Sequence, residues 1–184
     1  MIYPIVAYGH PVLKKVAKEI APESIDIQEL VDDMFETMHY AQGIGLAAPQ
    51  IGKSIRMFVA DASPMEDEEV QDFKKVFINP QILEEYGDEE PFEEGCLSLP
   101  HIRENVVRHG KILIRYFDEN WIEHEEKYEG IKARIIQHEY DHINGILFSD
   151  HFSAFKKRVL KSKLTSISKG KVKVDYRMIF PAKK

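Results

Sequence analysis

The sequence contains a single cysteine, Cys96, so no disulfide can form within the chain and its cysteine usage does not indicate an oxidising compartment. It also lacks any apolar run near the roughly 18 to 20 residues that a membrane-spanning helix requires. The first residues have neither the basic stretch and long apolar segment of a secretory signal nor the Arg-rich composition of a transit peptide. We therefore expect a cytoplasmic protein that does not enter a membrane.

Acidic residues are almost missing from the end of the chain. Residues 151–184 contain 11 Lys and Arg but only one acidic residue, Asp175, although the net charge of the whole chain is −6. The total length of 184 residues suits one domain with a real core, so we predict a single domain over 1–184 with a basic C-terminal helix or tail at about 152–184. Such a basic segment is either a docking surface for a polyanion such as RNA or a solvated helix face.

Apolar residues recur at helical spacing from Ile25 to Met38, which predicts an amphipathic helix. A second helical pattern follows Gly130 and stops at Asn144, and a third covers about 152–166. The remaining chain predicts a solvated acidic loop at 63–72 and short β-strands at 55–60, 75–79, 81–86, 105–109, 111–117, 121–128 and 172–180. This order favours an α+β fold in which mostly antiparallel sheets wrap around a central helix, the second one.

That second helix carries His138-Glu139-Tyr140-Asp141-His142, an H-E-x-x-H pattern. Residues four apart share one helix face with their Cβ atoms roughly 5 to 6 Å apart, so both imidazoles can bind one metal ion. Glu139 would lie beside the ion without binding it, where a carboxylate can take a proton from water and return it to a leaving amine. Because the pattern also occurs on helices by chance, a third ligand is needed.

Catalytic metal sites typically have three protein ligands and one open position. A metzincin would have its third His where this chain has Phe148, and no Glu occurs in 143–184 to complete the site as in other zinc proteases. The remaining soft donor is Cys96, although a lone Cys is more often a small buried hydrophobic residue. Together with the helix motif, it predicts a Cys96, His138 and His142 site for zinc or another divalent ion of similar softness.

A glycine-rich segment, GIGLAAPQ, runs from Gly43 to Gln50. Two closely spaced glycines indicate that the backbone approaches another group closely or adopts a positive φ, and Gln50 offers an amide donor. A glycine-rich helix exit followed by a proline turn would explain Gly43 and Pro49 only. No Lys-Ser/Thr pair follows, which disfavours a phosphate-binding loop.

Three segments, GIGLAAPQ at 43–50, EGCLS at 94–98 and QHEYDH at 137–142, resemble in this order the three signature motifs of the peptide deformylase family. The resemblance extends from near the N-terminus to about residue 168. It implies an α+β fold and a metal-dependent amide hydrolase that removes the N-formyl group from the initiator methionine of nascent polypeptides and releases formate. It also implies Fe(II) as the native metal, with Ni, Co or Zn in preparations of the protein.

The resemblance also implies a role for individual residues. Glu139 corresponds to the catalytic acid/base, and the metal ligands are Cys96, His138 and His142. The oxyanion donors correspond to the Gln50 amide and the Leu97 backbone N–H, and the backbone partner of the bound peptide to Gly45. The pocket for the methionine side chain is expected to be lined by Ile44, Ile131, Arg134 and Ile135.

Three charged residues near these motifs carry further expectations. The Arg134 side chain is expected to line the pocket with its stem while its guanidinium stays in water. Glu94 and Arg108 are expected to form a supporting ion pair. Residues 171–184 match no pattern that we can assign.

The partners implied are N-formyl-methionine nascent chains, and the basic C-terminal segment suggests the hypothesis that the protein also docks on the ribosome. Two other readings stay open at this point. A zinc metallopeptidase would cut internal amides. A non-catalytic metal site would hold the fold together and would normally be closed by four ligands, of which the sequence supplies three.

Overall fold

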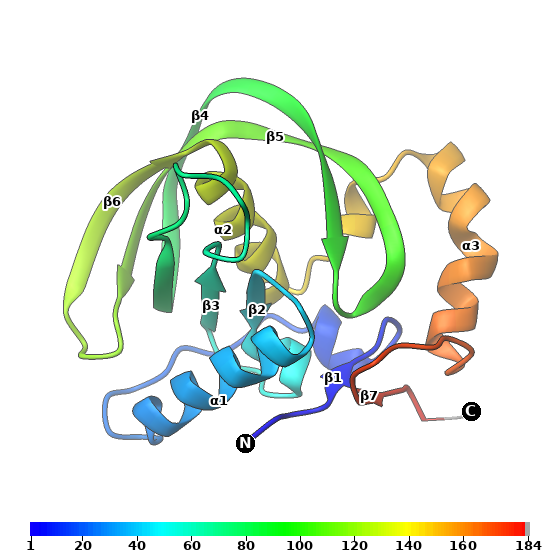
Figure 1. Ribbon diagram of the computed structural model, residues 1–184, viewed down its shortest axis with the longest axis horizontal. Coiled ribbons are helices and arrows are strands. Elements are labelled where there is room, and N and C mark those ends of the chain that lie inside the picture. The colour runs from blue at the N-terminus through cyan, green and yellow to red at the C-terminus, as the bar shows by residue number, and fades with distance from the viewer. Residues whose placement is uncertain (183–184) are drawn as a thin grey trace.

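The computed structural model describes residues 1–182 (Figure 1). Within them, no helix has the length and apolar character needed to cross a membrane. The elements are, in order, β1 Ile5–Val6, η1 Pro11–Lys14, α1 Ile27–Tyr40, β2 Gly45–Ala47, η2 Ala48–Ile51, β3 Met57–Asp61, β4 Lys74–Cys96, β5 Leu99–Phe117, β6 Glu123–Glu129, α2 Gly130–Ile143, η3 Phe148–His151, α3 Ala154–Ser168 and β7 Met178–Ile179, where η marks a 3-10 helix.

The main sheet has five strands in the order β2-β3-β4-β5-β6, and every neighbouring pair is antiparallel. Strands β4 and β5 are 23 and 19 residues long, and four register shifts interrupt their pairing. Such irregularities bend and twist a ribbon, and Figure 1 shows the β4–β5 ribbon arching over α2. A separate two-stranded sheet pairs β1 with β7 in parallel.

Helix α2 lies at the centre, where it packs against β2, β3, β5 and β6. It buries Ala133, Ile135, Ile136 and Ile143 in one core cluster with apolar residues of the sheet such as Phe58. The helix carries the H-E-x-x-H residues, so the predicted α+β fold with a central motif-bearing helix is confirmed.

A glycine at each end of α2 allows the chain to enter the helix and to pack closely where it leaves. Gly130 has a φ of +60°, a conformation that glycine adopts without steric cost, and the chain passes there directly from β6 into the helix. Gly145, just past the helix, has a φ of +74°, and a Cβ atom on it would lie 2.7 Å from the Lys14 carbonyl oxygen. A side chain at Gly145 would therefore push the N-terminal segment away from α2.

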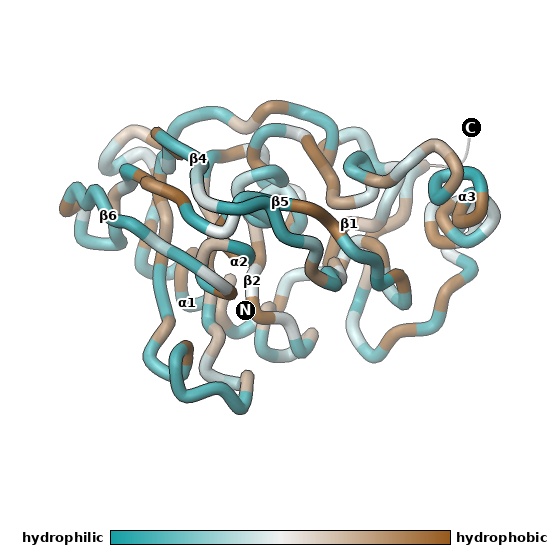
Figure 2. Tube along the Cα trace, turned by 90° about the horizontal axis from the view of Figure 1, so that it is seen from above, coloured by the Kyte–Doolittle hydropathy of each residue, from teal (hydrophilic) through white to brown (hydrophobic). Residues whose placement is uncertain are grey.

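The other two helices have side-chain caps. The Asp26 side chain accepts a hydrogen bond from the Glu29 backbone N–H at the start of α1, and Ser153 caps α3 in the same way. Helix α1 packs its apolar face on β2 and β3, whereas α3 packs on β5 and buries only Leu164 and Ile167. Figure 2 shows α3 at one end of the molecule.

The three predicted helices are confirmed with boundaries shifted by about one turn or less, and 63–72 contains neither helix nor strand, as expected. The strand predictions were less accurate. The predicted pairs of short strands are merged into the single long strands β4 and β5, because register shifts let the ladder continue past Pro80 and Gly110, which separate the predicted strands. The strand predicted at 172–180 is reduced to the two residues of β7, and β2 was not predicted.

Candidate metal centre

The three predicted ligands come together from two elements. Cys96 is the last residue of β4, whereas His138 and His142 lie one turn apart on α2. Their donor atoms all lie within 4.8 Å of one another, and Cys96 Sγ is 3.3 Å from His142 Nε2. Sulfur and nitrogen ligands at roughly 2.3 and 2.1 Å from a tetrahedral ion would be separated by roughly 3.6 Å. The donor set therefore fits a divalent metal ion.

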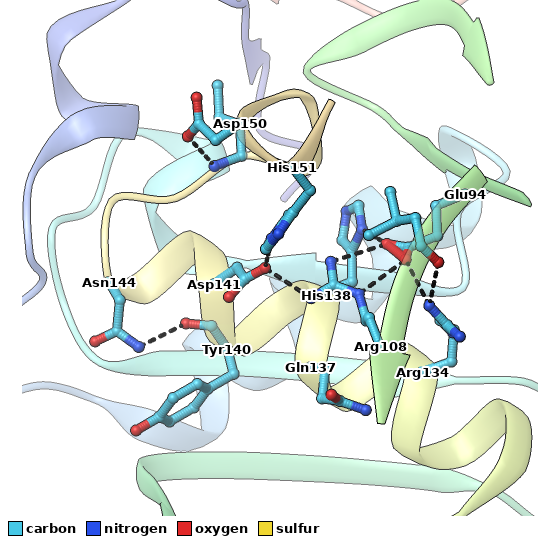
Figure 3. A network of polar contacts seen from close by, with 12 residues as sticks. Glu94, Arg108, Arg134, Gln137, His138, Tyr140, Asp141, Asn144, Asp150 and His151 are labelled. Carbon is cyan, nitrogen blue, oxygen red and sulfur yellow. Dashed lines mark hydrogen bonds and ion pairs between the residues drawn. The ribbon is translucent and has the colours of Figure 1, made fainter. Parts of the chain in front are cut away.

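Glu94 supports this cluster from the sheet (Figure 3). Its Oε1 is 2.8 Å from His138 Nδ1, which leaves the other ring nitrogen for an ion. Arg108 donates to both Glu94 oxygens, from Nε at 2.8 Å and Nη2 at 3.0 Å, so the expected ion pair is confirmed. Burial alone would raise the pKa of Glu94, but the hydrogen bonds from His138 and Arg108 outweigh it and lower the pKa to about 2. Glu94 is therefore ionised at neutral pH.

The same network reaches a residue inside the helix motif that sequence reasoning left without a role. Asp141 Oδ2 accepts from Arg108 Nη1 and lies close to His151 Nε2, both at 2.8 Å. Arg108 thus joins the sheet residue Glu94 to the helix residue Asp141. The only feature of the sequence that could have indicated this contact with Arg108 is the position of Asp141 about one helical turn after His138.

Arg134 corrects one expectation. Its guanidinium does not stay in water: the residue is only 8% exposed. Nη1 donates to the Val106 carbonyl at 2.8 Å and to Glu94 at 3.4 Å, and Nη2 donates to the Glu90 carbonyl at 2.7 Å. The guanidinium also lies over the Phe92 ring. These acceptors compensate for the lost hydration, so the charged group can be buried at the wall of the site.

Glu139 follows the ligand His138 in the chain, lines the same cavity as that ligand and is 4% exposed. Its Oε2 is buried and has no hydrogen-bond partner among the residues that the structure describes, and burial raises the pKa of Glu139 to about 7. A Cβ atom added to Gly45 would lie 2.4 Å from Glu139 Oε1. The close approach that the glycine-rich segment predicted is therefore an approach to this carboxylate.

The two candidate oxyanion donors lie on either side of Cys96. The Ala47 N–H donates to Gln50 Oε1 at 2.9 Å, which orients the amide so that Nε2 faces Cys96 Sγ at 3.5 Å and Ser98 Oγ at 3.3 Å. Leu97 follows Cys96, and within residues 1–182 its N–H makes no backbone hydrogen bond. Both N–H donors therefore lie next to the sulfur ligand; the Gln50 amide contacts Cys96 Sγ and Ser98 Oγ, whereas the Leu97 N–H has no backbone partner within the described residues.

Electrostatics at the ligands favours a bound cation. Burial lowers the pKa of His142 well below its usual value, so its imidazole is neutral, the form that binds metals. Burial also acts to lower the pKa of His138, but the neighbouring Cys96 and Glu94 outweigh it and raise that pKa. A positive charge is therefore stabilised between Cys96 and Glu94.

A cavity of about 1350 Å³ opens in front of the cluster. Its wall includes all the predicted substrate-binding residues and most of the predicted catalytic and metal-binding residues: Ile44, Gly45, Gln50, Cys96, Leu97, Ile131, Arg134, Ile135, His138 and Glu139. His142 lies behind this wall and is 1% exposed. Sequence reasoning missed a further part of the wall, residues 172–176 with Met178 and Phe180.

The number of metal ligands distinguishes a catalytic site from a non-catalytic site that only holds the fold together. Across the described residues 1–182, the cluster contains three candidate ligands and no fourth. Three ligands facing a cavity correspond to a catalytic site with an open position, whereas a structural site is normally closed by four.

Comparison with known proteins agrees with these features. The model of the polypeptide deformylase family matches residues 2–158. The peptide deformylase of Cytophaga hutchinsonii is 59% identical over 184 residues, covering 100% of both chains, and that of Christiangramia forsetii is 55% identical, covering 98% of this chain and 97% of the relative.

Solved structures give the same result. The peptide deformylase from Legionella pneumophila has a TM-score of 0.82 at 37% identity, covering 93% of this chain and 98% of that one. The enzyme from Thermus thermophilus has a TM-score of 0.83 at 39% identity, covering 92% and 99%. The chain therefore belongs to the peptide deformylase family, metal-dependent hydrolases that remove the N-formyl group from the methionine of nascent polypeptides.

Proposed function

We propose that Cys96, His138 and His142 hold the metal ion of this deformylase and that Glu139 moves the protons of the reaction. The observation that carries the proposal is the cluster of three donors within 4.8 Å of one another, beside a buried carboxylate oxygen without a partner among the described residues. An ion bound there would supply Lewis-acid chemistry, activating water and polarising the formyl carbonyl. We propose Fe(II) as the native ion, with Ni, Co or Zn in preparations, since imidazole and thiolate ligands suit these metals.

Substrate binding is proposed to use the cavity wall. The methionine side chain lies against Ile44, Ile131 and Ile135, with the buried Arg134 closing the pocket behind them. Gly45 belongs to β2, the edge strand of the main sheet, and its backbone can pair with an extended peptide. This arrangement would hold the formyl group over the metal cluster.

The chain's own groups then carry the proton and charge transfers. Glu139 takes a proton from the attacking water as the oxygen–carbon bond forms, and the Gln50 amide and the Leu97 N–H stabilise the resulting oxyanion. When the carbon–nitrogen bond breaks, Glu139 returns the proton to the amine, and formate is released. Donors of the oxyanion kind contribute roughly 10² to 10³ in rate, and the proton shuttle contributes roughly 10² to 10⁴.

Several wider features belong to the same proposal. Residues 1–184 form a single catalytic domain in the cytoplasm, where nascent chains are made. The exposed basic residues of α3 dock the enzyme on ribosomal RNA, as supported by the 11 Lys and Arg in residues 151–184.

The test of the residue roles is formate release from a formyl-Met peptide by protein prepared anaerobically with Fe(II) or Ni(II). We expect Glu139→Ala to retain stoichiometric metal and lose at least 10²-fold in kcat. We expect Cys96→Ala and His142→Ala to lose both metal and activity. Full activity of Glu139→Ala, or full metal content in both ligand variants, would overturn these assignments.

A further inference from the structure

The C-terminal segment 172–180 is part of the cavity wall, although the family model ends at residue 158. The segment is held at three points. β7 pairs with β1, the Lys173 carbonyl accepts from His101 Nε2 at 2.7 Å, and the Tyr176 hydroxyl donates to the Leu97 carbonyl at 2.8 Å. The third contact joins the segment to the chain directly after the ligand Cys96.

The short turn at Leu97 and Ser98 connects β4 to β5 and is fixed from three sides. The Leu97 carbonyl accepts from Tyr176, the Ser98 carbonyl accepts from the Tyr8 N–H at 2.9 Å, and Ser98 Oγ accepts from Gln50. The Leu97 N–H has no backbone partner within residues 1–182, and Leu97 lines the cavity directly after Cys96. Of these contacts, the one from Tyr176 is made directly to Leu97.

Tyr176 is well placed to hold the turn rigidly. The residue is half-buried against the core cluster that also contains Leu97 and Met178, so its ring has little freedom. Its hydroxyl is a neutral donor, and a hydrogen bond made in such surroundings costs free energy when one partner is removed. Without this donor, the peptide planes of the turn can rotate away from the position that aims the Leu97 N–H.

We propose that Tyr176 is a positioning residue for deformylation, whose hydrogen bond to the Leu97 carbonyl fixes the turn that presents the Leu97 N–H to the reacting carbonyl. This inference rests on the proposed function, in which that N–H stabilises the oxyanion. Within the described residues, the Tyr176 hydroxyl makes its one hydrogen bond to the Leu97 carbonyl, so the proposed effect of this hydroxyl passes through Leu97. The inference extends the machinery of the site to a segment outside the matched family region.

The test compares Tyr176→Phe with Tyr8→Phe in the full-length, Ni(II)-loaded protein. Tyr176→Phe keeps the ring and removes only the donor. Tyr8 also packs half-buried in the core, and within the described residues its hydroxyl makes no hydrogen bond, so Tyr8→Phe controls for the loss of a tyrosine hydroxyl. The measurements are kcat and KM for a formyl-Met peptide, each normalised to bound nickel, and the melting temperature.

We expect Tyr176→Phe to lower kcat about 10-fold with KM and nickel content unchanged, because the lost positioning affects the transition state only. Tyr8→Phe should keep kcat within about 2-fold of the unchanged protein. A kcat for Tyr176→Phe within that same range, or a change confined to KM or to the melting temperature, would overturn the inference. Glu139→Ala and Gln50→Ala in the same assay distinguish failure of the Tyr176 inference from failure of the proposed function. If these two variants retain full activity, the proposed function itself fails.

Discussion

At the scale of single residues, the site depends on how closely Gly45 approaches Glu139. The Gly45 Cα carries no side chain, and any Cβ there would overlap the carboxylate that we propose as the proton shuttle. The glycine is not needed for a left-handed backbone, because Gly45 does not have a positive φ. The glycine therefore leaves room for the Glu139 side chain and is not needed to permit a turn.

We predict that Gly45→Ala lowers kcat/KM by roughly 10²-fold, because the added methyl group displaces the Glu139 carboxylate from its reactive position. The check is steady-state kinetics on a formyl-Met peptide together with metal analysis, which should show unchanged binding of the ion. Gly110→Ala in β5 is the matched control, since its methyl group would meet only the Asp88 carbonyl oxygen at 3.4 Å. Equal activity of the two variants would refute this explanation.

We predict that Glu94→Gln destabilises the fold by up to roughly 3 to 5 kcal/mol, because it removes one of the two carboxylates that pair with the buried Arg108 guanidinium and leaves only Asp141. It should also weaken metal binding by roughly 10- to 100-fold through the lost support of His138. Urea unfolding and competition with a chelator measure the two effects.

The neighbouring residue Glu93 supplies the control for this prediction. Its ion pair with Arg103 has side chains that are 60% and 64% exposed, so Glu93→Gln should change stability by less than about 1 kcal/mol. Similar losses of stability in Glu93→Gln and Glu94→Gln would show that burial of the Arg108 pair is not the cause.

At the scale of elements, the β4–β5 ribbon carries half of the site to the helix. Its strands supply Glu94, Cys96 and Arg108, whereas α2 supplies the histidines and Glu139. Metal binding would therefore join the end of β4 to the C-terminal half of α2. Elsewhere, the β5–β6 pair has its own half-buried polar contact, in which the Tyr116 hydroxyl donates to Glu126 at 2.6 Å and Tyr128 donates to the same oxygen.

This second contact predicts a pH dependence of stability. Burial acts to raise the pKa of Glu126, but the hydrogen bonds from Tyr116 and Tyr128 outweigh it and hold the pKa below its usual value. Because the folded-state pKa is lowered, the stabilisation is fully present above the ordinary Glu pKa of about 4.3 and is lost as pH falls through the folded-state value.

We therefore expect Glu126→Gln to be about 1 kcal/mol less stable than the unchanged protein at pH 7, with a difference that disappears at low pH. Urea unfolding of both proteins from pH 7 to pH 3 checks this, and acid release of metal should affect both equally. Glu125→Gln, in an exposed pair with Arg115, should cost less than about 0.5 kcal/mol at pH 7. A difference for Glu126→Gln that stays constant with pH would contradict the assignment.

An element or site residue could be predicted from the sequence where a pattern of neighbouring residues determines it. The helical period from Ile25 to Met38 and the spacing of His138 and His142 lie within single helices, so the sequence indicated both. The burial of Arg134 and the wall around Tyr176 depend on partners far along the chain, and no local pattern indicates them. Strand β2 was missed because its glycine and alanine residues have little β-propensity, and its pairing with β3 decides its conformation.

At the scale of the whole molecule, charge is divided between an acidic body and a basic end. Five of the 11 basic residues in 151–184 lie on α3, which also leaves Phe155 and Val159 exposed at 74% and 59%. A helix with exposed cations and few buried contacts is suited to an external polyanion more than to its own core. This supports the proposed docking on ribosomal RNA.

We predict that Lys157→Glu combined with Lys161→Glu lowers ribosome affinity at least 10-fold and flattens its salt dependence, because each lost phosphate contact removes up to about one unit of the log–log slope. Both lysines are exposed, and turnover of a free formyl-Met peptide should not change. Lys15→Glu with Lys18→Glu makes the same charge change away from α3. Co-sedimentation with ribosomes that is equal for the two double variants would refute the role of α3.

The pairing of β1 with β7 joins Ile5 to Met178 and Val6 to Ile179. During translation, Ile5 and Val6 leave the ribosome early, yet their strand partner is added only after almost all of the chain. Until Met178 has emerged from the exit tunnel, these apolar residues lack their native neighbour, and the cavity lacks the wall that residues 172–180 provide. An enzyme that acts on other proteins at the start of their synthesis would thus complete its own cavity wall only after residues 172–180 have left the ribosome.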